Sequence, residues 1–399
     1  MFLRLMSALL LRGGRLWGLD GPADILVRDG VIERIEPGIA DGDTDVIDVA
    51  GRLVLPGLVD AHCHLDKTLF GGPWLPHSAG DALEDRIAND RRRRGELGIP
   101  SVERIVALLE RMVTSGTSHV RSHTDVDPDV GLRGVEAVRA AVQRLDGRIA
   151  VEQVAFPQHG LLINPGTAEL LEAALQSGVE TIGGIDPAGM DRDPVRHLDV
   201  IFDLAARYGA RIDLHLHDGG SLGTWELELI AERARDAGLG GRVTVSHAYG
   251  FGQADPAVQA RLIEQLAEAG VTLLTAAVYS FPVPPIKRLR AAGVNVACGH
   301  DGICDLWGPY GSGDMLERAM HLAYRSTFRR DEDIELALDA ATYGGARALG
   351  LEPYGLVPGA AADLLVVLAS NAAEAVVTHP VRALVLKGGR VVARDGSLA

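Results

Sequence analysis

The segment PGLVDAHCH, residues 56–64, combines a short apolar run with two histidines separated by one residue. Residues i and i+2 of an extended strand point to the same side, so His62 and His64 would share one face. Their imidazoles then lie together at the carboxyl end of the strand. The segment therefore predicts a buried β-strand that ends in a polar site.

Seven further apolar runs follow along the chain, and helical segments separate most of them. The eight predicted strands are 57–61, 119–123, 150–155, 181–185, 211–215, 243–247, 272–276 and 294–298. Strands that alternate with helices indicate parallel βα units, here closed into a (β/α)8 TIM-type barrel of the α/β class. An open doubly wound sheet is the alternative, but no glycine-rich dinucleotide or phosphate loop supports it.

Both ends of the chain have a different pattern, because their short apolar runs have no helices between them. Residues 24–28 and 31–35 flank the turn Asp29-Gly30, which is a typical hairpin signal. Residues 362–367 and 383–392 form a similar strand-rich segment. We therefore expect 1–55 and 346–399 to form one small β-sandwich domain, and 56–345 to form a metal-dependent hydrolase barrel.

The composition narrows the class of partner. A formal net charge of -15 argues against a nucleic-acid or anionic-membrane surface, because no basic excess is present to neutralise phosphates. Three cysteines are too few for a disulfide framework and suit a reducing compartment. No run approaches the roughly 18 to 20 apolar residues of a membrane span. We expect a cytoplasmic enzyme with a small-molecule substrate, and homo-oligomer formation stays open.

Reactive side chains are expected at the carboxyl ends of barrel strands. The matching residues are His62 and His64 on the first strand, His215 and His217 on the fifth, His247 on the sixth and Asp301 on the eighth. Imidazoles from two strands with one carboxylate suit a divalent zinc or iron ion. Such an ion lowers the pKa of bound water towards neutrality, and His247 fits as the group that deprotonates this water.

Several segments resemble a known family. Residues 56–64 and 359–367 resemble the first-strand and C-terminal signatures of the amidohydrolase superfamily, and the match extends over nearly the whole chain. Residues 122–127, 154–158 and 299–301 are similar to the cytosine deaminase-like branch. The segments 64–67, 183–187, 215–218 and 311–315 resemble in particular the N-isopropylammelide isopropylaminohydrolases of s-triazine breakdown.

The resemblance implies a role for individual residues. The implied metal ligands are His62, His64, His215 and Asp301. His247 would contact the hydrolytic water. Gln158 would form a hydrogen bond to a ring carbonyl, and Trp307 would form part of the pocket wall. Binuclear relatives carry a carboxylated lysine at the end of the fourth strand. Because this chain has Asp186 there and no lysine, one metal ion per chain is expected.

Two positions depart from the cytosine deaminases. The residue three after the strand-five metal ligand is Asp218 instead of glutamate, and the residue after Asp301 is Gly302 instead of a second aspartate. The missing carboxylate at Gly302 is expected to open space for an N-alkylated amine or a larger ring. Cytosine is therefore a poor fit as the substrate.

Lys67 and His217 complete the predicted catalytic set. An ammonium three residues beyond His64 can stabilise negative charge on an azine ring, whereas an ordinary surface position is the alternative for Lys67. His217 faces the same side as His215 and would contact the substrate. Either Asp218 or His217 would protonate the ring nitrogen, and the sequence leaves both open.

The resulting prediction is a metal-dependent aminohydrolase. It would release ammonia or an alkylamine from an amino-substituted pyrimidine or s-triazine, with His247 and Asp301 moving the proton of the attacking water. Hydrolysis of a cyclic amide by the same mononuclear site is the first alternative. A non-catalytic scaffold that has kept the fold is the second, and metal analysis separates it from an enzyme.

Overall fold

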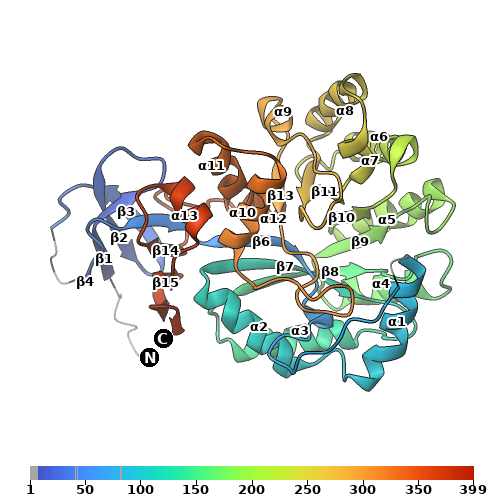
Figure 1. Cartoon of the computed structure of the whole chain (residues 1–399), viewed down its shortest axis with the longest axis horizontal. Coiled ribbons are helices and arrows are strands. Elements are labelled where there is room, and N and C mark those ends of the chain that lie inside the picture. The colour runs from blue at the N-terminus through green and yellow to red at the C-terminus, as the bar shows by residue number, and fades with distance from the viewer. Residues whose placement is uncertain (1–7, 41, 43, 81–82) are drawn as a thin grey trace.

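The computed structural model describes residues 8–40, 42, 44–80 and 83–399. It contains an eight-stranded parallel sheet wrapped by helices and, at one side, a second sheet built from both ends of the chain (Figure 1). The predicted (β/α)8 barrel with an additional β-domain is therefore confirmed.

The barrel strands follow one another in chain order around the ring. They are β6 (Leu58–Cys63), β7 (Thr117–Asp125), β8 (Ala150–Phe156), β9 (Thr181–Ile185), β10 (Arg211–Leu216), β11 (Val243–His247), β12 (Thr272–Thr275) and β13 (Val296–Cys298). The ring closes between β13 and β6, where the amide of Asp301 donates to the carbonyl of His62 at 2.9 Å. This closure brings the carboxyl ends of the first and last strands together.

Helices cover the outside of the barrel, and three further elements lie in the loops that follow strands. The covering helices are α2 (Val102–Thr114), α3 (Arg133–Arg144), α4 (Thr167–Gln176), α5 (Pro194–Tyr208), α6 (Gly220–Asp236), α8 (Pro256–Ala269), α9 (Ile286–Ala291), α10 (Met315–Arg325), α11 (Asp331–Ala340) and α12 (Tyr343–Leu349). The 3₁₀ turn η1 (Leu65–Lys67) and the helices α1 (Leu83–Glu96) and α7 (Tyr249–Gln253) belong to the loops that follow strands. None of these described helices is both long and apolar enough to span a bilayer.

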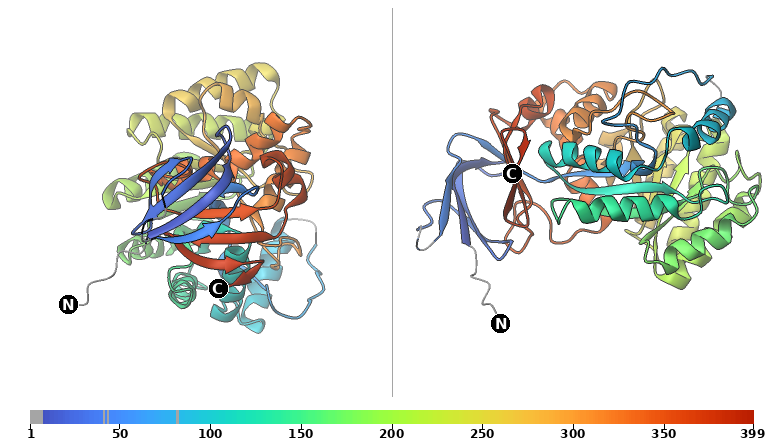
Figure 2. Two further views of the ribbon diagram at one scale, coloured as in Figure 1. Left: turned by 90° about the vertical axis from the view of Figure 1, so that its left-hand side faces the viewer. Right: turned by 90° about the horizontal axis from the view of Figure 1, so that it is seen from below.

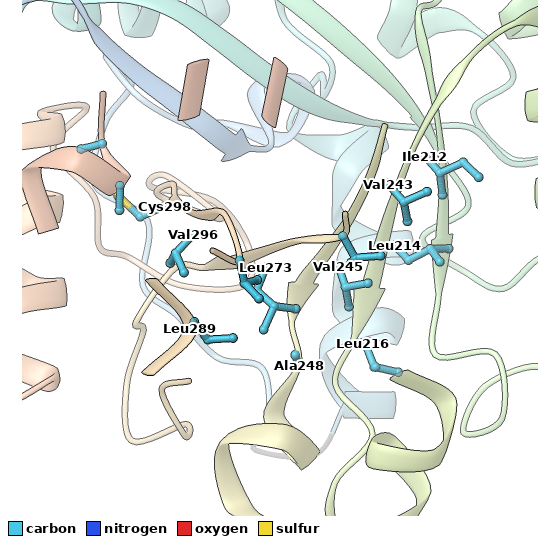
Figure 3. Packing of buried hydrophobic residues seen from close by; sticks show 14 of the residues in the cluster. Ile212, Leu214, Leu216, Val243, Val245, Ala248, Leu273, Leu289, Val296 and Cys298 are labelled. Carbon is cyan, nitrogen blue, oxygen red and sulfur yellow. The ribbon is translucent and has the colours of Figure 1, made fainter. Parts of the chain in front are cut away.

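Alternation along the strands separates the core from the site. On β10, Ile212, Leu214 and Leu216 belong to the hydrophobic cluster between strands and helices, together with Val243 and Val245 of β11 (Figure 3). The intervening side chains must then point into the barrel. On β10 the inward-pointing side chains are polar and include His215. The sequence therefore places apolar residues on the outside of the barrel and reactive residues on its inside.

The second sheet joins the two ends of the chain. Its strands are β1 (Ala8–Leu16), β2 (Pro22–Arg28), β3 (Val31–Glu36), β4 (Asp45–Asp48), β5 (Leu53–Pro56), β14 (Leu364–Val367), β15 (Arg382–Lys387), β16 (Arg390–Arg394) and β17 (Ser397–Leu398). The helix α13 (Ala372–Thr378) connects β14 to β15. Antiparallel pairing of β5 with β14 makes the two halves one continuous sheet beside the barrel (Figure 2).

The predicted hairpin at Asp29-Gly30 is present between β2 and β3, which pair in antiparallel register. Asp29 and Gly30 have φ values of 52° and 83°. Positive φ at both central residues is what a type I′ turn requires, and it suits the twist of the flanking strands. The turn therefore fixes the register of β2 and β3 locally.

Candidate active site

Four imidazoles and one carboxylate meet at the carboxyl ends of the strands. The ring of His62 lies 5.4 Å from that of His64, 4.6 Å from that of His215 and 5.0 Å from that of His247. The Oδ1 atom of Asp301 lies 3.3 Å from Nε2 of His64 and 3.8 Å from Nε2 of His62. The structure thus brings together every residue that the sequence suggests as a metal ligand, with His247 beside them.

Hydrogen bonds fix the orientation of two of these rings. Ser246 Oγ donates to Asp213 at 2.8 Å, so it accepts from Nδ1 of His62 at 2.9 Å. The Nδ1 atom of His64 donates to the carbonyl of His123 at 3.0 Å. Each ring therefore presents its Nε2 atom as a free lone pair, as metal-binding histidines do when their other nitrogen is held by the protein.

The cluster contains buried nitrogen atoms that have no protein partner. These are Nε2 of His62 and both ring nitrogens of His215, of His247 and of the neighbouring His123. Burial and neighbouring imidazoles lower the pKa of His62 and His215 far below the ordinary value, and that of His247 to about 3. Neutral imidazoles with free lone pairs are what a divalent ion requires, so these residues fit a metal site.

Three overlapping groups, each containing His62, place potential ligand atoms within 4.8 Å of one another. The groups are His62–His64–Asp301, His62–His215–His247 and His62–His123–Asp213. The third is the weakest candidate because Asp213 already pairs with Arg121 at 2.9 Å and accepts from Ser246. The first two together contain the four ligands suggested by the sequence.

Backbone strain marks the strand ends that carry the site. His247, Asp301 and Asp186 have φ values of 73°, 68° and 36°. Non-glycine residues seldom adopt this left-handed region, and such strain persists mainly where the surrounding structure enforces it. At His247 this backbone bend reverses the alternation of β11. Regular alternation would point the His247 side chain towards the helices, but the bend turns it towards His62.

Lys67 is buried beside the histidines, with 3% of its surface exposed, so it does not occupy an ordinary surface position. Its ammonium lies 3.0 Å from Asp125 Oδ1 and donates to Gln158 Oε1 at 2.6 Å. The rings of Phe156 and Trp307 lie 5.6 and 5.9 Å from it. Because lysine only donates, Gln158 turns its oxygen to Lys67 and keeps its NH2 group free to donate elsewhere.

Asp125 lies between two cations, because it pairs with Arg94 of α1 at 2.9 Å as well as with Lys67. Replacing it with asparagine removes the ion pair of Lys67 and leaves Arg94 with Asp90 alone, so we expect Asp125→Asn to lower the free energy of unfolding by about 3 kcal/mol. The exposed pair of Asp129 with Arg91 offers a control, and Asp129→Asn should change stability by less than about 1 kcal/mol. Urea unfolding of both variants measures the difference; equal effects would contradict this reading.

His217 points into the cluster and is held by Asp186. Its backbone amide and Nδ1 donate to the two carboxylate oxygens of Asp186 at 2.5 and 2.8 Å. Its ring stacks on His247 with 4.6 Å between centroids. Although burial lowers the pKa of His217, the charge and hydrogen bond of Asp186 raise it above its ordinary value. The Nε2 atom is therefore the end of the ring that faces a ligand.

Asp218 points away from the cluster. Its Oδ2 atom accepts from the amide of Gly189 at 2.8 Å, and its carboxylate neighbours Glu226 of α6. Burial raises the pKa of Glu226 to about 8, and the hydrogen bond to Asp218 adds to this. The strand alternation that puts His217 inside therefore puts Asp218 outside, and the structure does not bring Asp218 together with the predicted metal ligands.

The space beside Gly302 is filled, contrary to the expectation of an opening there. A Cβ atom built on Gly302 would lie 2.2 Å from Oδ2 of Asp305. Asp305 also braces its own loop, because its Oδ1 atom accepts from the amides of Trp307 and Gly308 at 2.8 and 2.9 Å. The carboxylate of Asp305, three residues after Gly302, therefore occupies the space beside Gly302, next to Asp301.

An aromatic row leads from the histidines to the surface. The ring of Tyr249 lies 5.5 Å from that of His247 and stacks on Phe281 at 4.6 Å. Phe281 meets Tyr279 edge-on at 6.2 Å, and Tyr279 meets Tyr310 at 5.9 Å. Tyr279 and Tyr310 are 52% and 68% exposed. The mouth of the barrel thus has an apolar wall on the side of His247 and His217.

The site contains residues that the sequence analysis did not assign. They are His123, Asp125, Asp186, Tyr249 and Asp305. The first three lie at or just beyond the ends of β7 and β9. Applying the strand-end rule to every strand would have found these three, whereas Tyr249 and Asp305 lie in loops whose path is not readable from the sequence.

Comparison with known proteins gives a consistent family match. The sequence profile of the amidohydrolase family matches residues 75–393. N-isopropylammelide isopropyl amidohydrolase of Pseudomonas sp. (strain ADP) is 33% identical over 396 residues, which cover 97% of each chain. Both matches span most of the described chain.

Solved structures agree with this match. The crystal structure of N-isopropylammelide isopropylaminohydrolase from Burkholderia multivorans has a TM-score of 0.95 and 44% identity, over 99% of this chain and 100% of that one. A 5-methylcytosine deaminase from Klebsiella pneumoniae, liganded with 5-fluorocytosine, has a TM-score of 0.84 and 28% identity, over 96% and 97%. Each of these proteins is similar to this chain in fold and in sequence.

Proposed function

Because this chain belongs to the amidohydrolase family, we propose that it removes a substituted amine from an s-triazine or pyrimidine ring by metal-dependent hydrolysis. Metal-dependent hydrolysis of a C–N bond follows from the family and its aminohydrolase relatives. The observation that supports an azine ring as the substrate is the set of convergent imidazoles and Asp301 beside the buried Lys67–Gln158 pair.

We assign the metal to His62, His64, His215 and Asp301. The free Nε2 atoms of His62 and His64, both near Asp301 Oδ1, support this assignment. A zinc or iron ion bound there supplies Lewis acidity and lowers the pKa of water at the site. The absence of a lysine at the end of β9 supports one ion per chain.

His247 is the proposed base that takes the proton from the attacking water. Its two ring nitrogens have no protein partner, and its ring lies 5.0 Å from those of His62 and His215. Burial keeps the ring neutral, which is the form a base requires. Asp301, at the closing seam of the barrel, is one of the charged groups that act on His247, and its carboxylate would pass the proton on.

His217 is the proposed acid that protonates the ring nitrogen. Asp186 holds its Nδ1 proton, so its Nε2 atom faces the substrate and can carry the transferred proton. Lys67 and Gln158, which are hydrogen-bonded to each other, would orient the ring, with the Gln158 amide donating to a ring carbonyl and Lys67 balancing negative charge. Together these groups hold an electron-poor C=N carbon near the metal ligands while the amine leaves.

The aromatic row supports a substituted amine as the leaving group. Tyr249 and Phe281 offer an apolar surface beside His247 and His217, where a departing amine would project. Burying an isopropyl group on such a surface is worth about 2 kcal/mol. We therefore expect N-alkylated rings to be better substrates than rings with an unsubstituted amine.

The test is amine release from cytosine, 5-methylcytosine, ammelide, N-isopropylammelide and N-benzylammelide, with metal content measured on the same sample. We expect kcat/KM for an N-alkylammelide to exceed that for cytosine by at least about tenfold. If a bound metal is present but no azine releases amine, the proposal is wrong. Hydrolysis of cyclic amides, detected by ring opening without amine release, is then the function to test.

The choice between the two proton donors gives a separate prediction. We expect His217→Asn to lower kcat by about 10² to 10³ while the metal is retained. Asp218→Asn, one residue further along the chain, should keep most of the turnover because its side chain points away from the cluster. Steady-state kinetics with metal analysis compares the pair, and the reverse order of effects would assign the role to Asp218.

A further inference from the structure

The carboxylate of Asp305 is buried next to the proposed metal ligands. Asp305 is 1% exposed, and its Oδ2 atom occupies the place that a side chain at residue 302 would fill, directly after Asp301. Gly302 does not have a positive φ, so its backbone would accept any residue. The carboxylate of Asp305, rather than the backbone, is therefore what keeps position 302 free of a side chain.

The two oxygens of this carboxylate have different surroundings. The Oδ1 atom accepts from the amides of Trp307 and Gly308, which holds the loop after β13 in place. The Oδ2 atom accepts no hydrogen bond from any described residue. This atom is not one of the fully buried oxygens that lack a partner, so it keeps a small accessible surface through which water or a ligand can donate to it.

The carboxylate of Asp305 lies within electrostatic reach of Lys67 and of His64, one of the proposed metal ligands. The loop that Asp305 braces carries Trp307, whose ring lies 5.9 Å from the ammonium of Lys67. Burial raises the pKa of Asp305 to about 6, although Lys67 opposes this rise, so the group is an anion in mildly alkaline solution. Such an anion accepts an N–H group and repels a carbonyl oxygen or an unprotonated ring nitrogen.

We propose that Asp305 is a specificity-determining residue whose Oδ2 atom accepts a hydrogen bond from an N–H group of the bound azine. The ligand class is an azine in a lactam form, which carries a ring N–H next to a carbonyl, or one whose departing amine retains an N–H. The inference rests on the proposed function, because it places an azine beside Asp301. It also predicts discrimination against rings in which this N–H is methylated.

The first experiment uses Asp305→Asn in the full-length protein. Asparagine keeps the oxygen that holds Trp307 and Gly308 but replaces the free acceptor with an NH2 donor. The probe is cyanuric acid, the hydroxylated product expected from an ammelide, with binding followed by calorimetry at about pH 6.5, where the ring is mostly neutral and Asp305 is mostly ionised. We expect binding to weaken by about 10- to 100-fold, with metal content and thermal midpoint unchanged. Trimethyl isocyanurate, the cyanuric acid ring with all three N–H groups methylated, should bind weakly to both proteins.

The second experiment moves the carboxylate. Asp305→Ser keeps a hydroxyl that can accept from the loop amides and vacates the space beside residue 302. Adding Gly302→Asp to this variant returns a carboxylate to almost the same place, so the double variant should recover at least about tenfold of the lost affinity. Gly302→Asp alone should bind worse than wild type, because two carboxylates then compete for one space.

The outcomes separate this inference from the proposed function. Wild-type affinity in Asp305→Asn, or no recovery in the double variant, would overturn the role of Asp305 even if amine release is observed. Failure of wild type to bind cyanuric acid would overturn it as well. If wild type binds cyanuric acid, Asp305→Asn does not, and no azine releases amine, then Asp305 recognises an azine N–H but the proposed reaction is wrong.

Discussion

His247→Asn is expected to leave the metal content unchanged and to lower kcat by about 10³-fold. The assigned ligands do not include His247, so its loss should remove the base and not the ion. Asparagine is of similar polarity and can occupy the strained backbone position of His247, where φ is 73°, because asparagine tolerates this region. Metal analysis and steady-state kinetics on one preparation measure both quantities.

This variant also decides between two of the metal-binding groups. If the group His62–His215–His247 holds the ion, His247→Asn will lose metal and activity together. If His62, His64 and Asp301 hold it with His215, only activity will fall. Loss of metal in His247→Asn would therefore contradict the assignment of His247 as the base.

His215→Ala is expected to lose both metal and turnover. The ring of His215 lies 4.6 Å from that of His62 and 5.5 Å from that of His64, and Phe156 stacks on its other side at 4.1 Å. Removing it takes away one of the four assigned ligands. Removing a residue that only hydrogen-bonds to a metal ligand typically weakens metal binding by roughly 10- to 100-fold. The loss in metal affinity of His215→Ala should exceed that.

A histidine away from the cluster serves as the control for this variant. His321 lies on α10 and is half-buried, so His321→Ala should retain metal and activity. Metal content after exhaustive dialysis and kcat/KM are measured for both variants. Full activity of His215→Ala with bound metal would remove His215 from the ligand set.

Much of the fold could be predicted because each barrel strand carries its own local signal. The predicted strands 181–185 and 243–247 agree with β9 and β11, and the apolar alternation on β10 distinguishes the face of His215 from that of Leu214. The hairpin at Asp29-Gly30 was equally local. These features depend on neighbouring residues in the chain, so the sequence contains them.

The parts of the site that could not be predicted depend on tertiary structure. Asp125 contacts Lys67 only because β7 lies beside β6 in a particular register. The free space expected at Gly302 is filled by Asp305, because the loop after β13 folds back on itself. The choice between His217 and Asp218 depended on where β10 ends, and strand ends are poorly defined by sequence alone.

The pairing of β5 with β14 has a consequence for how the chain reaches this fold. These strands come from opposite ends of the sequence, so their contact closes one of the longest loops in the protein, and such non-local contacts form slowly. During synthesis β5 leaves the ribosome early, and its edge stays unpaired until β14 has been made. An open strand edge can pair with other chains, so nascent chains are exposed to aggregation for most of translation.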